Sequence, residues 1–214
     1  MSKIRTANDL SNYLDSEQSW RKKEIITIKL MHDGAREHHA VMLRRAGIAL
    51  LYAHWEGFVK ATGTAYVEYV GRQNLRYRDL QPGFLALAMK AQIEQAVSSA
   101  KGQLLTQIAE FFVNRMDEPV KLVSSKAVQT KSNLSADRLR DIITVLGLDY
   151  RPFELLEKNV IERLVSQRHS IAHGHYLDVD RKEFGTLHQQ TLAMLDEFRT
   201  QVENAALTHA FQQS

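Results

Sequence analysis

Proline is scarce in this chain, and its scarcity constrains the fold more than any other feature of the sequence. Only 3 of the 214 residues are proline and 10 are glycine, so long stretches lack the residues that most strongly interrupt a helix. In several of these stretches apolar residues recur with helical spacing, as in Leu187, Leu192, Leu195, Phe198 and Val202. The sequence therefore predicts an all-α fold with long helices rather than a turn-rich β fold.

Local start and stop signals set the expected helix boundaries. Ser135 suits an N-cap, Pro152 suits a first helical turn, and Asp33-Gly34 suits a helix end. Asp180 and Glu183 resemble a capping box ahead of the last helix. The expected helices are 7–32, 36–72, 84–116 with a break near Gly102, 136–146, 151–173 and 184–211.

The chain shows no clear domain boundary, so we expect one domain over residues 1–214, with 1–35 as an N-terminal helical extension of a core at 36–210. Residues 117–133 are the least defined. Within them, 120–123 suits a short strand or an irregular packed segment, and 124–132 suits a polar linker. Gly47, Gly57 and Gly63 inside the second helix each cost about 1 kcal/mol relative to alanine, which predicts close packing of another helix there.

Composition excludes several classes of protein. The chain has no cysteine, so disulfides and thiolate zinc sites are excluded and a reducing compartment is compatible. No signal sequence or membrane span is visible, and we expect a cytoplasmic location. The net charge of +3 is too mild to indicate nucleic-acid binding by itself. The local placement of cationic side chains matters more.

The segment Arg168-His169-Ser170-Ile171-Ala172-His173-Gly174 carries the clearest chemical signal. Arginine is always charged and presents a planar fork of donors that suits phosphate. Histidine readily moves a proton near neutral pH. These two groups suffice for metal-independent RNA cleavage, because the 2′-hydroxyl of RNA is itself a nucleophile. The alternative is a solvated arginine and a histidine that caps the helix.

An earlier helical segment, residues 50–60, carries Glu56 and Lys60 four residues apart. Such a pair is most often a surface ion pair worth a few tenths of a kcal/mol. Here the neighbouring residues are apolar around most of the helix, which indicates burial in the core or at a partner interface. Charges in such surroundings must be paired or used, so a functional pair is the alternative. Trp55, Tyr52 and Phe58 suit core or dimer contacts better than base stacking.

These two motifs, in this order on helices, resemble those of the HEPN superfamily of all-helical domains over roughly residues 36–210. Ribonuclease members carry an arginine followed by a histidine on a late helix, matched by Arg168 and His173. They often carry Glu-x-x-x-Lys on an early helix, matched by Glu56 and Lys60. The residues around the two motifs are most similar to those of a cyanobacterial-type subgroup found beside bacterial defence and toxin–antitoxin genes. The resemblance implies an up-and-down bundle with a composite dimer site.

Other chemistries have less support in the sequence. His169 and His173 have the spacing of a metal-binding pair, but a zinc protease needs glutamate where Ser170 stands, and no third ligand follows. No phosphate-binding glycine loop or serine hydrolase motif is present. We therefore expect no metal and no cofactor.

Five residues rotate an ideal helix by about 140°, so Arg168 and His173 do not share a face of a regular helix. Either Gly174 loosens the helix end, or the two groups meet through a partner subunit; the resemblance implies the second. We expect a homodimeric, metal-independent endoribonuclease of toxin or phage-defence type that leaves 2′,3′-cyclic phosphate and 5′-hydroxyl ends, with Glu56 and Lys60 in support. His169 and Ser170 are secondary candidates.

Two other functions remain open. One is a catalytically silent HEPN module that binds RNA, nucleotide or a protein partner. The other is a toxin held inactive by a cognate antitoxin or a neighbouring defence protein. In one branch of the superfamily a partner enzyme modifies a tyrosine two residues after the motif histidine. That position is His175 here, and Tyr176 follows it.

Overall fold

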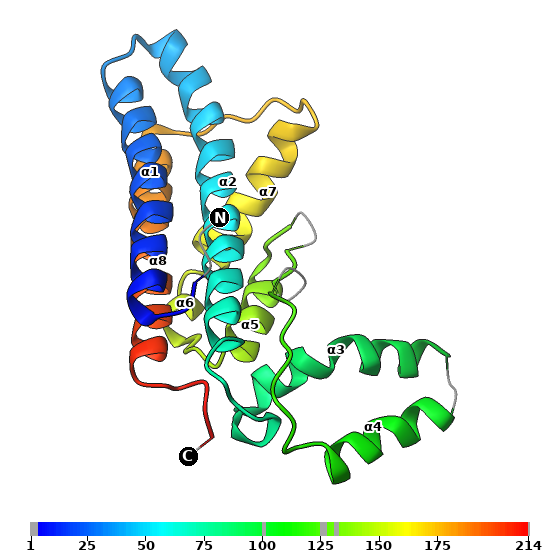
Figure 1. The fold of residues 1–214 in the computed structure, drawn as a ribbon. Coiled ribbons are helices and arrows are strands. Elements are labelled where there is room, and N and C mark those ends of the chain that lie inside the picture. Colours follow the sequence, from blue (N-terminus) through cyan, green and yellow to red (C-terminus); the bar gives the residue numbers. More distant parts are fainter. Residues whose placement is uncertain (1–3, 100–101, 125–127, 131–132, 214) are drawn as a thin grey trace.

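The computed structural model describes residues 4–99, 102–124, 128–130 and 133–213. Three long helices lie side by side and form the body of the molecule: α1 (Ala7–Asp33), α2 (Glu37–Val70) and α8 (Arg181–Leu207) (Figure 1). Among the described residues β structure is limited to two isolated bridges, so the predicted all-α fold is confirmed. In that same part of the chain, no helix combines the length and apolar character that a membrane span requires.

The first helix belongs to the bundle rather than standing apart from it. Thr6 and Asp9 form a reciprocal capping box at its start, and the chain turns at Gly34 into α2. Leu10, Leu14 and Ile25 are buried where α1 packs against α2 and α8. The segment that we expected to extend a core at 36–210 therefore supplies part of that core.

The second helix packs against α1, α7 and α8. Close packing of another helix against an interior glycine, as predicted, occurs at Gly47. A Cβ at Gly47 would lie 2.6 Å from Cζ of Phe184, on α8. Trp55 is buried between Phe153 and Phe198, with ring centres 6.0 and 6.2 Å away. The indole of Trp55 therefore fills the core of a single chain, which leaves the exposed side of α2 to other residues.

A helical hairpin projects from one end of the bundle (Figure 1). It consists of α3 (Pro82–Ser99) and α4 (Gly102–Asn114), so the expected break near Gly102 is confirmed. After it, residues 120–123 form no strand and run as irregular chain. Part of the expected polar linker, residues 125–127 and 131–132, lies outside the described residues.

The region before the late motif departs from the prediction. The helix α5 (Ala136–Val145) begins at Ser135 as expected, but 151–173 is not one helix. It divides into α6 (Arg151–Glu154), a π-helical turn at Glu157–Ile161, and α7 (Glu162–Ala172). The N–H of Ile161 bonds to the carbonyl of Leu156 five residues back. This wider turn buries Val160 and Ile161, whereas Leu155 before it remains 88% exposed.

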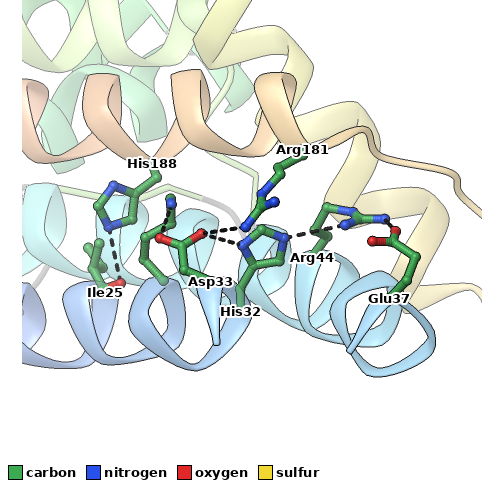
Figure 2. Close-up of polar contacts among 8 residues, drawn as sticks. Ile25, His32, Asp33, Glu37, Arg44, Arg181 and His188 are labelled. Atoms are coloured by element: carbon green, nitrogen blue, oxygen red, sulfur yellow. Dashed lines mark hydrogen bonds and ion pairs between the residues drawn. The ribbon is translucent and has the colours of Figure 1, made fainter. Parts of the chain in front are cut away.

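A polar network ties α1, α2 and α8 together where the first two helices meet (Figure 2). The buried His32 contacts Oδ1 of Asp33 through Nδ1 at 2.9 Å and Nη1 of Arg44 through Nε2 at 3.3 Å. Because a guanidinium can only donate, Nε2 accepts and Nδ1 carries the proton. Arg44 also donates to Glu37 at 2.7 Å, and Arg181 lies 3.8 Å from Asp33. These charges are paired with one another and serve the fold.

The N-cap of α8 follows half of the expected pattern. Oδ1 of Asp180 accepts the N–H of Glu183 at 2.8 Å, as an N-cap does. The carboxylate of Glu183 does not return to the Asp180 backbone as a capping box requires. It binds Arg163 and Gln167 of α7 instead, so tertiary contacts displaced the local bond.

Candidate functional site

Arg168 lies on α7 and packs against α2. Its guanidinium carbon is 4.9 Å from the centre of the Tyr52 ring, within the range of a cation–π contact. The side chain is half-buried, and no carboxylate of the described residues lies within ion-pairing distance of it. Among the described residues, no carboxylate neutralises the positive charge of Arg168.

Tyr52 is the site residue that sequence reasoning missed, since it was expected to be only a core or dimer contact. It is 1% exposed, and its hydroxyl accepts the backbone N–H of Leu134 at 2.8 Å. Burial raises the pKa of Tyr52 to about 12; the nearby Glu56 carboxylate adds to the rise, and Arg168 opposes it. The available signal was spacing, because Tyr52 lies four residues before Glu56 on the same helical face.

Glu56 lies one helical turn after Tyr52, next to the tyrosine that contacts Arg168. Its side chain is half-buried, and its Oε1 atom is buried without a hydrogen-bond partner among the described residues. A buried carboxylate oxygen with no partner is costly, so this atom has unused hydrogen-bonding capacity. The structure shows no ion pair between Glu56 and either Lys60 or Arg168.

Lys60 does not join this group. It is exposed and lines a cavity of about 590 Å³ between α1 and α2, whose walls include Ile4, Tyr13 and Ala61. Lys60 lies eight residues after Tyr52, about 12 Å further along the helix axis. The early motif is therefore split, with Glu56 beside Arg168 and Lys60 at the neighbouring cavity.

His173 caps the C-terminal end of α7. The N–H of Gly174 bonds to the carbonyl of Ile171, and the N–H of His175 bonds to that of Ser170 at 2.9 Å. This is a Schellman arrangement, with Gly174 at φ +75°, a conformation that glycine adopts without strain.

Three exposed imidazoles follow one another at this end. The His173 ring lies 4.3 Å from that of His169 and 6.4 Å from that of His175. Ser170 is half-buried beside them, with its carbonyl used in the helix end. The arrangement presents solvent-accessible groups that can exchange protons.

Arg168 and His173 do not contact each other within one chain. Arg168 points toward α2, whereas the His173 ring packs at a tilt against the His169 ring at the helix end. Gly174 terminates the helix without turning His173 back to Arg168. A single chain therefore displays the Arg168 guanidinium on one side of α7 and a row of imidazoles on another.

Among the described residues, no three side chains of the kinds that bind metals gather in one place. A protein-family model described as HEPN_MAE_28990-like HEPN matches residues 10–211. Comparisons with curated proteins and with solved structures give no match. The matched range holds Glu56, Lys60, Arg168 and His173, and it confirms the resemblance inferred from the two motifs. The chain belongs to the HEPN family.

Proposed function

We propose that this protein is a metal-independent endoribonuclease that acts as a homodimer. The observation that carries the proposal is Arg168, a half-buried cation that contacts the Tyr52 ring and has no carboxylate partner in the part of the chain that the structure describes. Such a cation has its charge and its donors available for a phosphate. The exposed imidazole of His173, at the end of the same helix, supplies the second requirement, a group that transfers protons.

In the proposed reaction the RNA 2′-oxygen attacks the adjacent phosphorus while the bond from phosphorus to the 5′-oxygen breaks. One imidazole accepts the 2′-hydroxyl proton, and a proton is delivered to the departing 5′-oxygen. Arg168 binds the phosphate and stabilises charge on its non-bridging oxygens. The products are a 2′,3′-cyclic phosphate and a 5′-hydroxyl end.

A homodimer would bring together an arginine and a histidine that lie apart within a single chain. Because Arg168 and His173 face apart on α7, a twofold contact that pairs two α7 helices would place the arginine of each subunit near the histidine of its mate. Within one composite site, the proton that the His173 imidazole accepts from the 2′-hydroxyl can be passed on to the departing 5′-oxygen. Glu56 would orient the arginine through its free oxygen, Lys60 would add a cation along the RNA, and His169 and Ser170 would support His173.

The test uses Arg168→Ala and His173→Ala, each assayed on single-stranded RNA in excess EDTA. Each variant should lose cleavage. His173→Ala should keep its melting temperature, and Arg168→Ala should lower it by only a few degrees, because it loses the cation–π contact with Tyr52 but leaves no cavity in the core. A mixture of the two inactive variants, refolded together, should recover activity above either parent, because the mixed dimer restores one arginine beside one histidine. No recovery, in a mixture shown to exchange subunits, would contradict a composite site.

The biological setting belongs to the same proposal. Expression of the wild-type protein should arrest growth, and the His173→Ala protein should not, if the enzyme is a toxin or a phage-defence effector. Such an enzyme would require a cognate antitoxin or a neighbouring defence protein as partner. RNA binding without cleavage by the wild type would instead indicate a catalytically silent binding module.

A further inference from the structure

Arg45, on α2, resembles Arg168 of α7 in that its guanidinium contacts a tyrosine ring and not a carboxylate. Its Nη2 donates to the backbone carbonyl of His175 at 3.2 Å, and its guanidinium carbon lies 5.5 Å from the centre of the Tyr176 ring. The side chain is half-buried, its Nε atom is buried without a partner, and the described residues place no carboxylate within ion-pairing distance of it.

The adjacent arginine shows that this arrangement is not a general property of the helix. Arg44 is buried and donates to Glu37 at 2.7 Å, within the network of Figure 2. Most of the arginines that the structure describes are likewise paired with a carboxylate, as Arg115 is with Glu118. Arg45 and Arg168 are instead each held by the face of a tyrosine.

The choice of partner determines what an arginine can still do. A carboxylate occupies two donors of the guanidinium and neutralises its charge. An aromatic face orients the guanidinium while leaving its N–H donors and most of its positive field available. An arginine held in this second way is prepared for a phosphate rather than already satisfied.

The position of Arg45 relates it to the proposed site. Arg45 and Tyr52 are seven residues apart on α2, which places them on nearly the same face and about 10 Å apart along the helix axis. Tyr52 holds Arg168, and Arg45 contacts the segment that follows His173. The guanidinium groups of Arg45 and Arg168, neither of which has a carboxylate partner among the described residues, therefore both lie on the side of α2 that faces α7 and the histidine segment after it.

We propose that Arg45 is a second phosphate-binding residue, which holds the RNA strand at a phosphate other than the one bound by Arg168. The inference rests on the proposed function for the identity of the ligand. Tyr176, which is 75% exposed, orients the Arg45 guanidinium at the surface. The His175 carbonyl uses one Nη2 donor and the Nε–H is buried, so the remaining Nη donors are left for the strand.

The experiment measures RNA binding rather than cleavage. A fluorescently labelled single-stranded RNA is titrated with full-length His173→Ala protein, with and without Arg45→Gln, over a series of salt concentrations. Loss of one phosphate contact should reduce the slope of log affinity against log salt by about 0.7 and weaken binding several-fold at low salt. Arg115→Gln, which removes the same charge from an arginine already paired, should leave the slope unchanged.

Two further measurements separate this role from a structural one. Arg45→Lys should keep the slope close to the parent value, because it retains the charge. If Arg45→Gln leaves both slope and affinity unchanged, or lowers only the melting temperature or dimer stability, Arg45 anchors the His175 segment and the inference is wrong. Because binding is measured in a variant that does not cleave, this outcome is distinct from a failure of the proposed catalysis.

Discussion

Tyr52 allows the role of a side chain in the fold to be separated from its role at the site. The phenol oxygen and the phenol ring make different contacts: the oxygen accepts the N–H of Leu134 at 2.8 Å and lies beside the Glu56 carboxylate, and the ring faces the guanidinium of Arg168 at 4.9 Å. Tyr52→Phe removes the first contact and keeps the second. Tyr52→Leu removes both. The two variants should therefore affect stability and cleavage in different proportions.

The expected magnitudes follow from these contacts. In Tyr52→Phe the Leu134 N–H stays buried without an acceptor, which costs about 1–3 kcal/mol of unfolding free energy. For a chain of this size each kcal/mol lowers the melting temperature by about 2–4 °C. Cleavage should remain near the wild-type rate, because the ring still orients Arg168. In Tyr52→Leu the lost cation–π contact, worth roughly 0.5–2 kcal/mol, should lower kcat/KM by about tenfold, the equivalent of roughly 1.4 kcal/mol.

The assay pairs thermal unfolding with initial rates of RNA cleavage in EDTA. Burial raises the pKa of Tyr52 to about 12, above its ordinary value of 10.0, so the fold favours the neutral phenol. The stability from this group is fully present below pH 10 and is lost as the pH rises toward 12. The stability advantage of wild type over Tyr52→Phe should shrink over that range. Equal losses of cleavage in Tyr52→Phe and Tyr52→Leu would refute the argument from the ring.

Two other predictions concern charged side chains. Lys60→Ala should change the unfolding free energy by less than about 0.5 kcal/mol, because Lys60 is exposed and has no ion-pair partner among the described residues. The variant should weaken cleavage at least about tenfold if Lys60 contacts RNA, and a wild-type rate would remove Lys60 from the site. Burial lowers the pKa of His54, and the Glu24 carboxylate opposes this shift. The stability that the neutral imidazole contributes is therefore present above about pH 6.5 and is lost as the pH falls below that value. Chemical denaturation of His54→Gln should show a smaller acid-side loss than wild type, and the exposed His39→Gln should show the wild-type loss; equal losses in all three proteins would assign the acid sensitivity to other groups.

Much of the helical architecture was determined by the sequence alone. Apolar spacing placed the long helices, and capping chemistry placed their ends: Ser135 accepts the N–H of Arg138 at the start of α5, and Gly147 adopts φ +67° after its end. These are interactions between residues a few positions apart, so they can be read from local order. The break between α6 and α7 was not predicted. The local sequence continues as helix, and the π-helical turn exists because it brings Val160 and Ile161 into the core.

The candidate site divides in the same way. The sequence identified Arg168, His173 and Glu56 by residue type and spacing, and it predicted that Arg168 and His173 would not share a helical face. It did not indicate that Tyr52 holds Arg168, because that contact depends on how α7 packs against α2, more than a hundred residues away along the chain. The neighbouring arginines show the limit most clearly. Arg44 and Arg45 are adjacent and chemically identical, but a helix turns by about 100° between them. The buried Arg44 side chain therefore pairs with the exposed Glu37, whereas Arg45 reaches a tyrosine face at the surface, and only the tertiary structure assigns these partners.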